Sequence, residues 1–390
     1  MKISQDRILT THVGSLPRPG DLVELLKHKQ NGDKLDEAAF ETRVKQAVKD
    51  SVREQADAGI DVISDGEMGK VGFIPYVNER LEGFEWRGYG ANQSYWGQSR
   101  EAKAFPDYYE WAAKQSGTAG GTGTMRWSCI GPVKYRGHAA LKKDVDNLKA
   151  AMQGAKVEEA FIPSISVGNI VDWNKNEYYK TTEEYLEAVA NAMREEYKAI
   201  VDAGFIVQVD DPNLATYYVL HPEMDIQEVR RWANVCVEAL NHALRDIPRD
   251  RVRYHTCYSI NMGPRLHDME GKDILDIVLK VKAGAYSFEA ANPRHEHEWK
   301  LWGDKLKLPE GAVIIPGVIS HSTNLIEHEE LVAERLVRFA KVVGRENVMA
   351  GADCGFASFA TSLEVHNSIV WAKFKNLVEG ARIASRELWR

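Results

Sequence analysis

The chain has 390 residues, of which 44% are hydrophobic and 27% are charged, as is ordinary for a globular protein. Its formal net charge of -7 argues against binding to nucleic acid or to anionic membranes, because both attract basic surfaces. The N-terminal residues lack the apolar stretch of a signal peptide, no apolar run reaches the ~20 residues that span a bilayer, and only four cysteines occur, so we expect a cytoplasmic protein.

Short apolar segments that end in polar residues alternate with longer amphipathic segments along the chain. The predicted strands are 7–15, 60–67, 124–133, 159–166, 205–212, 251–257, 285–290, 312–320 and 347–355. β-Branched residues dominate most of them, as in parallel strands that are buried on both faces. Apolar residues at helical spacing predict helices at 36–59, 181–204, 226–244, 273–284 and 328–344. Alternation of this kind predicts a parallel sheet with helices outside it.

The nine predicted strands are one more than a closed barrel of eight strands needs. Residues 124–133 are the best candidate for the extra strand, because they follow the least regular part of the chain, 85–123, which resembles an inserted loop. We therefore predict an α/β fold, a single (β/α)8 TIM-type barrel over residues 1–390 with loop insertions, one of them around 85–123. A doubly wound open sheet is the alternative.

The polar residues at the ends of the predicted strands are candidates for an active site, because the βα loops of parallel barrels carry the catalytic residues. His255 and Cys257 close one strand, and their i, i+2 spacing turns both to the same side. Glu289 and Cys354 close two other strands. An imidazole, two thiolates and a carboxylate suit Zn²⁺, so these residues predict a zinc site.

The motifs and their order resemble the cobalamin-independent methionine synthase family, specifically its catalytic C-terminal barrel standing alone. The resemblance rests on TTHVGSLPRP (10–19), DGE (65–67), QVDDP (208–212), HTC (255–257), SFEA (287–290), IPGVISH (315–321) and ADCG (352–355). It implies a zinc-dependent S-alkyltransferase that activates a thiol as a zinc-bound thiolate. The thiol would be homocysteine, and the alkyl donor a methyl-folate or another compound.

The resemblance also implies roles for individual residues. The implied zinc ligands are His255, Cys257, Glu289 and Cys354. The residues implied to hold the amino-acid part of homocysteine are Ser15, Glu67 and Asp210, and His321 is implied to act as an acid near the reacting centre. Asp211 departs from the family, which usually has Glu there, and 176–179 looks more like a short-chain branch related to epoxyalkane:coenzyme M transferases.

Three functions therefore stay open, with methyl transfer to homocysteine favoured. Alkylation of a sulfonate thiol such as coenzyme M would need a basic residue, for which Arg18, Lys70 and Arg294 are the candidates. A non-catalytic, zinc-stabilised binding protein is the third. The sequence leaves open the alkyl donor, the physiological thiol and whether the chain forms a homo-oligomer.

Several other residues of reactive type have simpler structural interpretations. Cys129 and Cys236 are expected in the core, and Asp211 is expected to cap a turn before a proline. His295 and His297 lie in a charged loop and are expected to be solvated or outside the ligand shell. For His12, the sequence does not distinguish a core position from one in the pocket.

Overall fold

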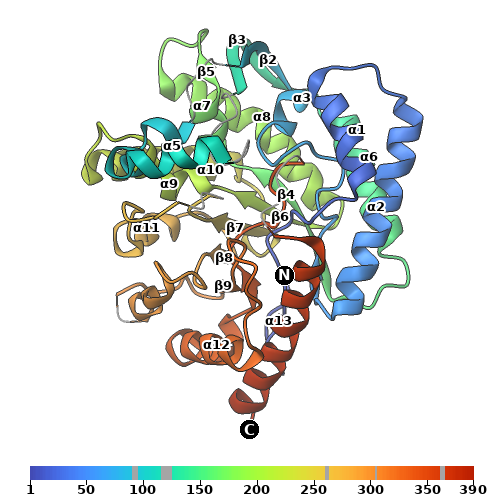
Figure 1. Ribbon diagram of the computed structural model, residues 1–390, viewed down its shortest axis with the longest axis vertical. Coiled ribbons are helices and arrows are strands. Elements are labelled where there is room, and N and C mark those ends of the chain that lie inside the picture. The colour runs from blue at the N-terminus through green and yellow to red at the C-terminus, as the bar shows by residue number, and fades with distance from the viewer. Residues whose placement is uncertain (90–94, 116–124, 260–262, 304, 361–364) are drawn as a thin grey trace.

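The computed structural model describes residues 1–89, 95–115, 125–259, 263–303, 305–360 and 365–390. A curved parallel sheet has the strand order β1-β4-β6-β7-β8-β9-β10. Its strands are β1 (Val62–Ile63), β4 (Glu159–Ile165), β6 (Ile206–Asp210), β7 (Val252–Thr256), β8 (Ala285–Phe288), β9 (Val313–Ile319) and β10 (Gly351–Ala352). This sheet runs through the centre of the molecule (Figure 1).

The N-terminal segment joins the two edges of this sheet. Thr10 pairs with Ala350 beside β10, and Thr11 pairs with Val62 of β1, both in parallel. Thr11 N donates to Ala350 O at 2.8 Å, and Val62 N donates to Thr10 O at 3.0 Å. The predicted closed barrel is therefore confirmed, although the segment predicted as a strand at 7–15 pairs with both edges only through these two threonines.

Helices surround the barrel, with α2 and α6 on one side and α11 and α12 on the opposite side (Figure 1). The helices of eight or more residues are α1 (Gly20–Asn31), α2 (Glu37–Ala58), α5 (Pro106–Gln115), α6 (His138–Ala151), α8 (Thr182–Asp202), α9 (Pro212–Leu220), α10 (Ile226–Ala243), α11 (Gly271–Val278), α12 (Glu329–Val343) and α13 (Asn367–Leu388). The helices predicted from spacing correspond to α2, α8, α10, α11 and α12, whereas the spacing did not predict α1, α5, α6, α9 and α13. Shorter helices are α3 (Tyr76–Arg80), α4 (Arg100–Ala104) and α7 (Val167–Trp173).

A second, three-stranded sheet lies outside the barrel. It contains β2 (Leu81–Tyr89), β3 (Met125–Tyr135) and β5 (Lys175–Asn176), so the predicted strand at 124–133 is the extra one, as expected. Tyr135 and Arg80 anchor this sheet to the barrel, because both bind the buried carboxylate of Glu196 on α8, at 2.8 and 3.1 Å. Where residues 85–123 are described, they form the end of β2, a 3-10 turn, α4 and α5 instead of an irregular loop.

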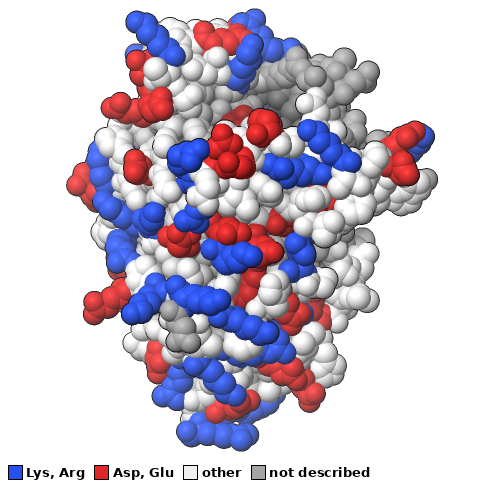
Figure 2. All heavy atoms as spheres, turned by 90° about the vertical axis from the view of Figure 1, so that its left-hand side faces the viewer, with Lys and Arg blue, Asp and Glu red and all other residues white. Residues whose placement is uncertain are grey.

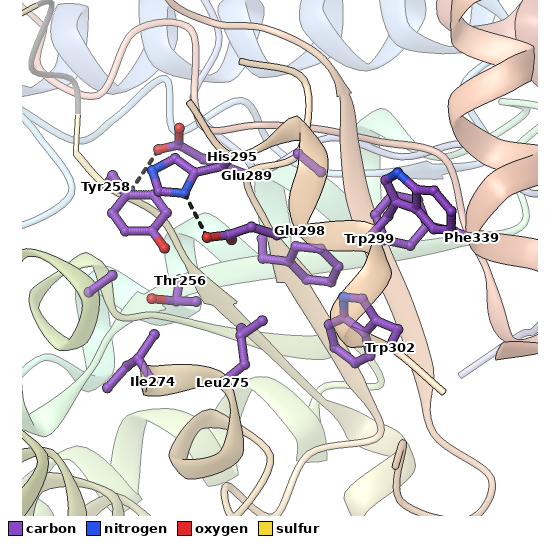
Figure 3. Close-up of a pocket in the computed structure, with 13 residues that line it drawn as sticks. Thr256, Tyr258, Ile274, Leu275, Glu289, His295, Glu298, Trp299, Trp302 and Phe339 are labelled. Carbon is purple, nitrogen blue, oxygen red and sulfur yellow. Dashed lines mark hydrogen bonds and ion pairs between the residues drawn. The ribbon is translucent and has the colours of Figure 1, made fainter. Parts of the chain in front are cut away.

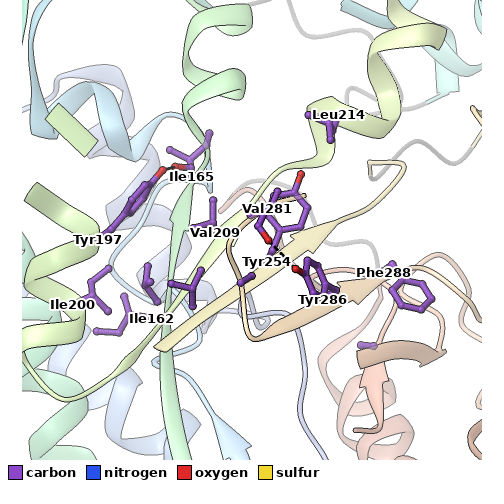
Figure 4. Close-up of a cluster of buried hydrophobic side chains, with 14 of the residues drawn as sticks. Ile162, Ile165, Tyr197, Ile200, Val209, Leu214, Tyr254, Val281, Tyr286 and Phe288 are labelled. Atoms are coloured by element: carbon purple, nitrogen blue, oxygen red, sulfur yellow. Dashed lines mark hydrogen bonds between the residues drawn. The ribbon is translucent and has the colours of Figure 1, made fainter. Parts of the chain in front are cut away.

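Apolar side chains fill the spaces on both faces of the strands. Figure 4 shows residues of β4, β6, β7 and β8 packed with Tyr197 and Ile200 of α8. The buried hydroxyl of Tyr197 donates to Ile165 O at 2.7 Å, so its ring enters the core without an unpaired polar atom. Burial of each such large side chain contributes about 1.5–3 kcal/mol. Cys129 and Cys236 are buried in this core, as predicted.

Polar residues inside the barrel hold the N-terminal segment in place. Arg253 of β7 donates to Thr11 Oγ1 at 2.8 Å and to the carbonyl of His12. The ring of His12 is buried, with Nε2 at 2.7 Å from Gln55 Oε1 and Nδ1 accepting from Gly14 N at 3.2 Å. His12 is therefore a core residue, and burial lowers its pKa to about 3.

Candidate active site

Three metal-ligand side chains converge at the carboxyl ends of two strands. His255 lies in β7, Cys257 directly after it, and Cys354 follows β10. Their ligand atoms all lie within 4.8 Å of one another, and we call them the sulfur–imidazole group. The two Sγ atoms are 3.2 Å apart, and both cysteines are free thiols. The structure thus brings together three of the four predicted zinc ligands.

The surroundings of the sulfur–imidazole group suit a bound cation. His255 Nδ1 lies 3.1 Å from Ser287 Oγ on β8, whereas its buried Nε2 has no hydrogen-bond partner among the residues that the structure describes. Burial lowers the pKa of His255 to about 3, so the ring is neutral and its nitrogen is able to bind a metal. The neighbouring Cys257 thiol, together with burial, raises the pKa of Cys354 well above its usual value. A divalent metal would satisfy the imidazole nitrogen and favour thiolates, so the residues present fit zinc.

Glu289, the fourth predicted ligand, belongs to an adjacent cluster. Its ligand atom lies within 4.8 Å of those of His321 and Asp353, and we call these three the carboxylate–imidazole group. Its Oε2 is held by Arg265 Nη1 at 2.6 Å and by an asparagine, and its Oε1 accepts from the backbone N of Tyr258 at 2.7 Å. Although burial opposes ionisation, Arg265 keeps the pKa of Glu289 below its usual value.

The other members of the carboxylate–imidazole group carry polar atoms that are not satisfied. Among the described residues, neither ring nitrogen of His321 makes a hydrogen bond, and burial lowers the pKa of this histidine to about 4. Asp353 Oδ1 accepts from the backbone N of Ala290 and Ala291, both at 2.8 Å, but in the described ranges Oδ2 has no hydrogen-bond partner. Burial and the charge of Glu289 raise the pKa of Asp353 to about 7. The sequence analysis missed Asp353, although it directly precedes a candidate ligand in ADCG.

Two of the predicted substrate-binding residues are buried carboxylates whose charges interact. Asp210 ends β6, and burial, followed by the charge of Glu67, raises its pKa well above the usual value. Glu67 has a φ of 57°, and within the described residues its Oε2 makes no hydrogen bond, although Lys70 Nζ lies 3.9 Å from it. A non-glycine residue in this left-handed region stores strain, which is characteristic of functional sites. We call Glu67 and Asp210 the acidic pair.

Ser15 lies against the turn that carries Cys354. A Cβ atom added to Gly355 would lie 2.0 Å from Ser15 Oγ, so only glycine allows the serine to approach. The backbone N of Phe356 donates to Ser15 O at 3.0 Å. Because Gly355 directly follows Cys354, these contacts bring the N-terminal segment, to which Ser15 belongs, next to the sulfur–imidazole group.

The basic residues considered for a sulfonate are already engaged. Arg18 donates to Ala357 O and to Glu67 O, both at 2.8 Å. Lys70 Nζ donates to Pro163 O at 2.6 Å and lies 3.9 Å from Glu67 Oε2. Arg294 donates to Leu266 O at 2.9 Å. The acidic pair therefore outweighs the one lysine that lies beside it.

His295 follows the second of its two predicted environments, outside the ligand shell but not solvated. It is buried and stacks on Tyr258 with ring centroids 3.8 Å apart. Figure 3 shows it at the wall of a pocket that Glu289 and Glu298 also line. His297, in contrast, is exposed, as expected of the charged loop. The carboxylates of Asp268 and Glu298 compensate the cost of burying His295.

The fold and these residues define a parallel α/β barrel with metal-ligand side chains where its strands end. The chain matches the family described as "Cobalamin-independent synthase, Catalytic domain" over residues 8–161 and 164–382, and it belongs to that family. The resemblance drawn from the motifs is thereby confirmed.

Individual proteins agree with this assignment. A methionine synthase of Sulfolobus acidocaldarius is 26% identical over 382 residues, which cover 97% of this chain and 93% of that protein. One of Thermococcus kodakarensis is 25% identical, covering 98% and 94%. The solved structure of a B12-independent methionine synthase from Shewanella sp. W3-18-1, in complex with selenomethionine, aligns with a TM-score of 0.72 at 20% identity, over 98% of this chain and 99% of that one. This likeness supports the fold.

Proposed function

We propose that the protein is a zinc-dependent methyltransferase of the methionine synthase type, which activates homocysteine through its thiol. The observation that carries the proposal is the sulfur–imidazole group, in which two thiols converge with a buried imidazole nitrogen that makes no hydrogen bond within the described part of the chain. When bound, zinc would supply the Lewis acidity that makes a coordinated thiol lose its proton at neutral pH. The free state of all four cysteines suits a reducing cytoplasm.

The acidic pair would hold the amino group of homocysteine. Glu67 and Asp210 repel each other, and burial makes their charges costly. An ammonium group beside them would relieve the repulsion and would bind Glu67 Oε2, which makes no hydrogen bond within the described residues and has only a long ion pair with Lys70, at 3.9 Å. A sulfonate in the same place would add a third negative charge. The acidic pair therefore favours an amino-acid thiol over a sulfonate thiol.

His321 would supply or hold a proton near the reacting sulfur. It lies at the end of β9, beside Glu289, and both of its ring nitrogens are free of hydrogen bonds within the described part of the chain. In the ligand-free protein burial keeps the ring neutral. It can act as an acid when a further anion beside it raises its pKa, as a negatively charged alkyl donor would.

Zinc-edge X-ray absorption of the purified protein, with and without homocysteine, tests the proposal. We expect zinc with two sulfur ligands from the protein and a gain of one sulfur ligand when homocysteine is added. Glu67→Gln should bind zinc as well as the wild type but bind homocysteine at least about tenfold more weakly, because a charge-assisted contact is lost. The exposed Glu79→Gln is the matched control.

The alternatives give different spectra. A gain of sulfur with mercaptoethanesulfonate but not with homocysteine would replace this substrate by a sulfonate thiol. Zinc that gains no ligand from either thiol would favour the non-catalytic binding protein. Absence of zinc from protein prepared with the metal would contradict the proposal as a whole.

A further inference from the structure

Arg265 occupies a constrained position beside the proposed metal site. It lies in the loop between β7 and α11 and is buried. Its backbone φ is 57°, a value that residues other than glycine rarely adopt. Its Nη1 contacts Glu289 Oε2 at 2.6 Å, and its Nη2 donates to the carbonyl of Ser259 at 2.7 Å. The strained backbone therefore serves to bring a guanidinium to this carboxylate.

The contacts of Glu289 decide what this carboxylate is able to do. Three donors occupy it, namely the guanidinium, the Nδ2 of Asn292 at 2.7 Å and the backbone N of Tyr258 at 2.7 Å. A carboxylate offers about four lone-pair sites, so one is left for a further partner. Tyr258 directly follows the proposed ligand Cys257, so the hydrogen bond from Tyr258 N holds Glu289 next to the sulfur–imidazole group. Glu289 itself is not a member of that group.

We infer that Arg265 is a positioning residue that competes with the metal for Glu289. The inference rests on the proposed zinc site. Held by the guanidinium, the carboxylate has its charge neutralised by a close partner and is less strongly attracted to a second cation. One coordination position of the metal thus stays accessible to the thiol, while Glu289 lies beside the metal as a replacement ligand. Arg265 in this way sets the balance between a closed site and one that accepts substrate.

The direction of the mutational effect separates this role from a merely structural one. If Arg265 only stabilised the loop, its removal would loosen the site and weaken zinc binding. If it competes with the metal, its removal frees Glu289 to bind the metal. Zinc binding then becomes tighter, and homocysteine, which must displace a more firmly bound carboxylate, binds more weakly.

The test combines Arg265→Met and Glu289→Gln in a double-mutant cycle, with zinc affinity measured by competition with a chelator. We expect Arg265→Met to bind zinc about tenfold more tightly and, when zinc-loaded, to bind homocysteine about tenfold more weakly, the scale of effects from residues that orient metal ligands. In the Glu289→Gln background, Arg265→Met should change neither affinity. Arg265→Lys, which keeps the charge without the forked geometry, should shift both affinities in the same direction by less.

Weaker or unchanged zinc binding in Arg265→Met, in a protein that still melts cooperatively, overturns the inference. So does a shift that persists when Glu289 is Gln. Should Arg265→Met fail to fold, Arg265→Lys still tests the sign, and the double variant leaves no buried charge without a partner. Failure of the proposed function looks different, because the wild type would then bind no zinc, or Cys354→Ser would bind it equally well.

Discussion

His295 is a charged side chain buried in the protein at neutral pH. Its Nε2 lies 3.1 Å from Asp268 Oδ2, and its Nδ1 lies 3.2 Å from Glu298 Oε1. Burial by itself lowers the pKa of this histidine, but the two carboxylates outweigh burial and raise it to about 9. The imidazolium therefore ties the loop after β8 to the segment that precedes α11.

This raised pKa predicts how stability depends on pH. The folded-state pKa of about 9 exceeds the unfolded value near 6.5, so the contribution of His295 is complete below about pH 6.5 and is lost as the pH rises through 9. His295→Asn should therefore lower the free energy of unfolding by about 3 kcal/mol more at pH 6 than at pH 10. Urea unfolding at both pH values measures the difference. The exposed His297→Asn is the control, and an equal loss at both pH values for His295→Asn would refute the argument.

Most candidate ligands at strand ends could be predicted from the sequence, whereas Arg265 in a loop and Asp353 beside a predicted ligand could not. His255, Cys257 and Cys354 are found together because parallel strands bring their ends to one edge of the barrel. Arg265 and Asp353 gave no comparable signal. Arg265 acts from a loop without periodicity, and Asp353 becomes significant only because the fold places it against a glutamate from another strand.

Among the elements, helix α10 shows how a local sequence signal becomes stability. Asp225 accepts from Glu228 N at 2.8 Å, and the Glu228 side chain accepts from Asp225 N at 2.8 Å, which is a capping box. Asp225→Ala should lower the free energy of unfolding by about 1 kcal/mol, because it leaves an end N–H of the helix without its partner. Chemical denaturation compares it with Glu238→Ala, an exposed substitution within α10. Equal effects of the two would show that the cap is not the cause.

The same caps explain which elements could be predicted. Asp36 caps α2 and Thr181 caps α8, and both helices begin where the sequence predicted. Asp211 likewise caps α9 through Leu214 N, at 3.4 Å. The helix α13 escaped prediction, because no side chain of the usual capping type precedes it and its cap is His366. The strand predicted at 7–15 was too long. Where this segment closes the barrel beside β10, the pairing between Thr10 and Ala350 is a single bridge.

At the scale of the whole molecule, the surface carries charges of both signs. Figure 2 shows acidic and basic side chains interspersed over one face. In the described part of the chain, no helix is long and apolar enough to cross a membrane. Asp210, at the end of β6, pairs in register with His255 of β7, so a thiol held by its amino group at Asp210 would reach toward the sulfur–imidazole group.

The closed barrel also predicts how the protein responds to loss of the metal. The proposed ligands lie at the ends of β7 and β10, but backbone pairing with neighbouring strands holds both strands without any metal. Chelator-treated protein and Cys354→Ser should therefore still melt cooperatively, with a melting temperature only several degrees below that of the zinc-loaded protein, because zinc adds only the linkage free energy of binding. Thiol binding, in contrast, should be lost in both.

Calorimetry with and without zinc, alongside titration with homocysteine, measures the two effects separately. Cys236→Ala is the matched control, since its thiol lies in the core and outside the sulfur–imidazole group, and it should keep both the metal and the thiol binding. A protein in which zinc serves only the fold behaves in the opposite way, because structural zinc sites supply folding free energy directly. Loss of cooperative melting on metal removal would therefore identify a structural zinc and argue against catalysis at this site.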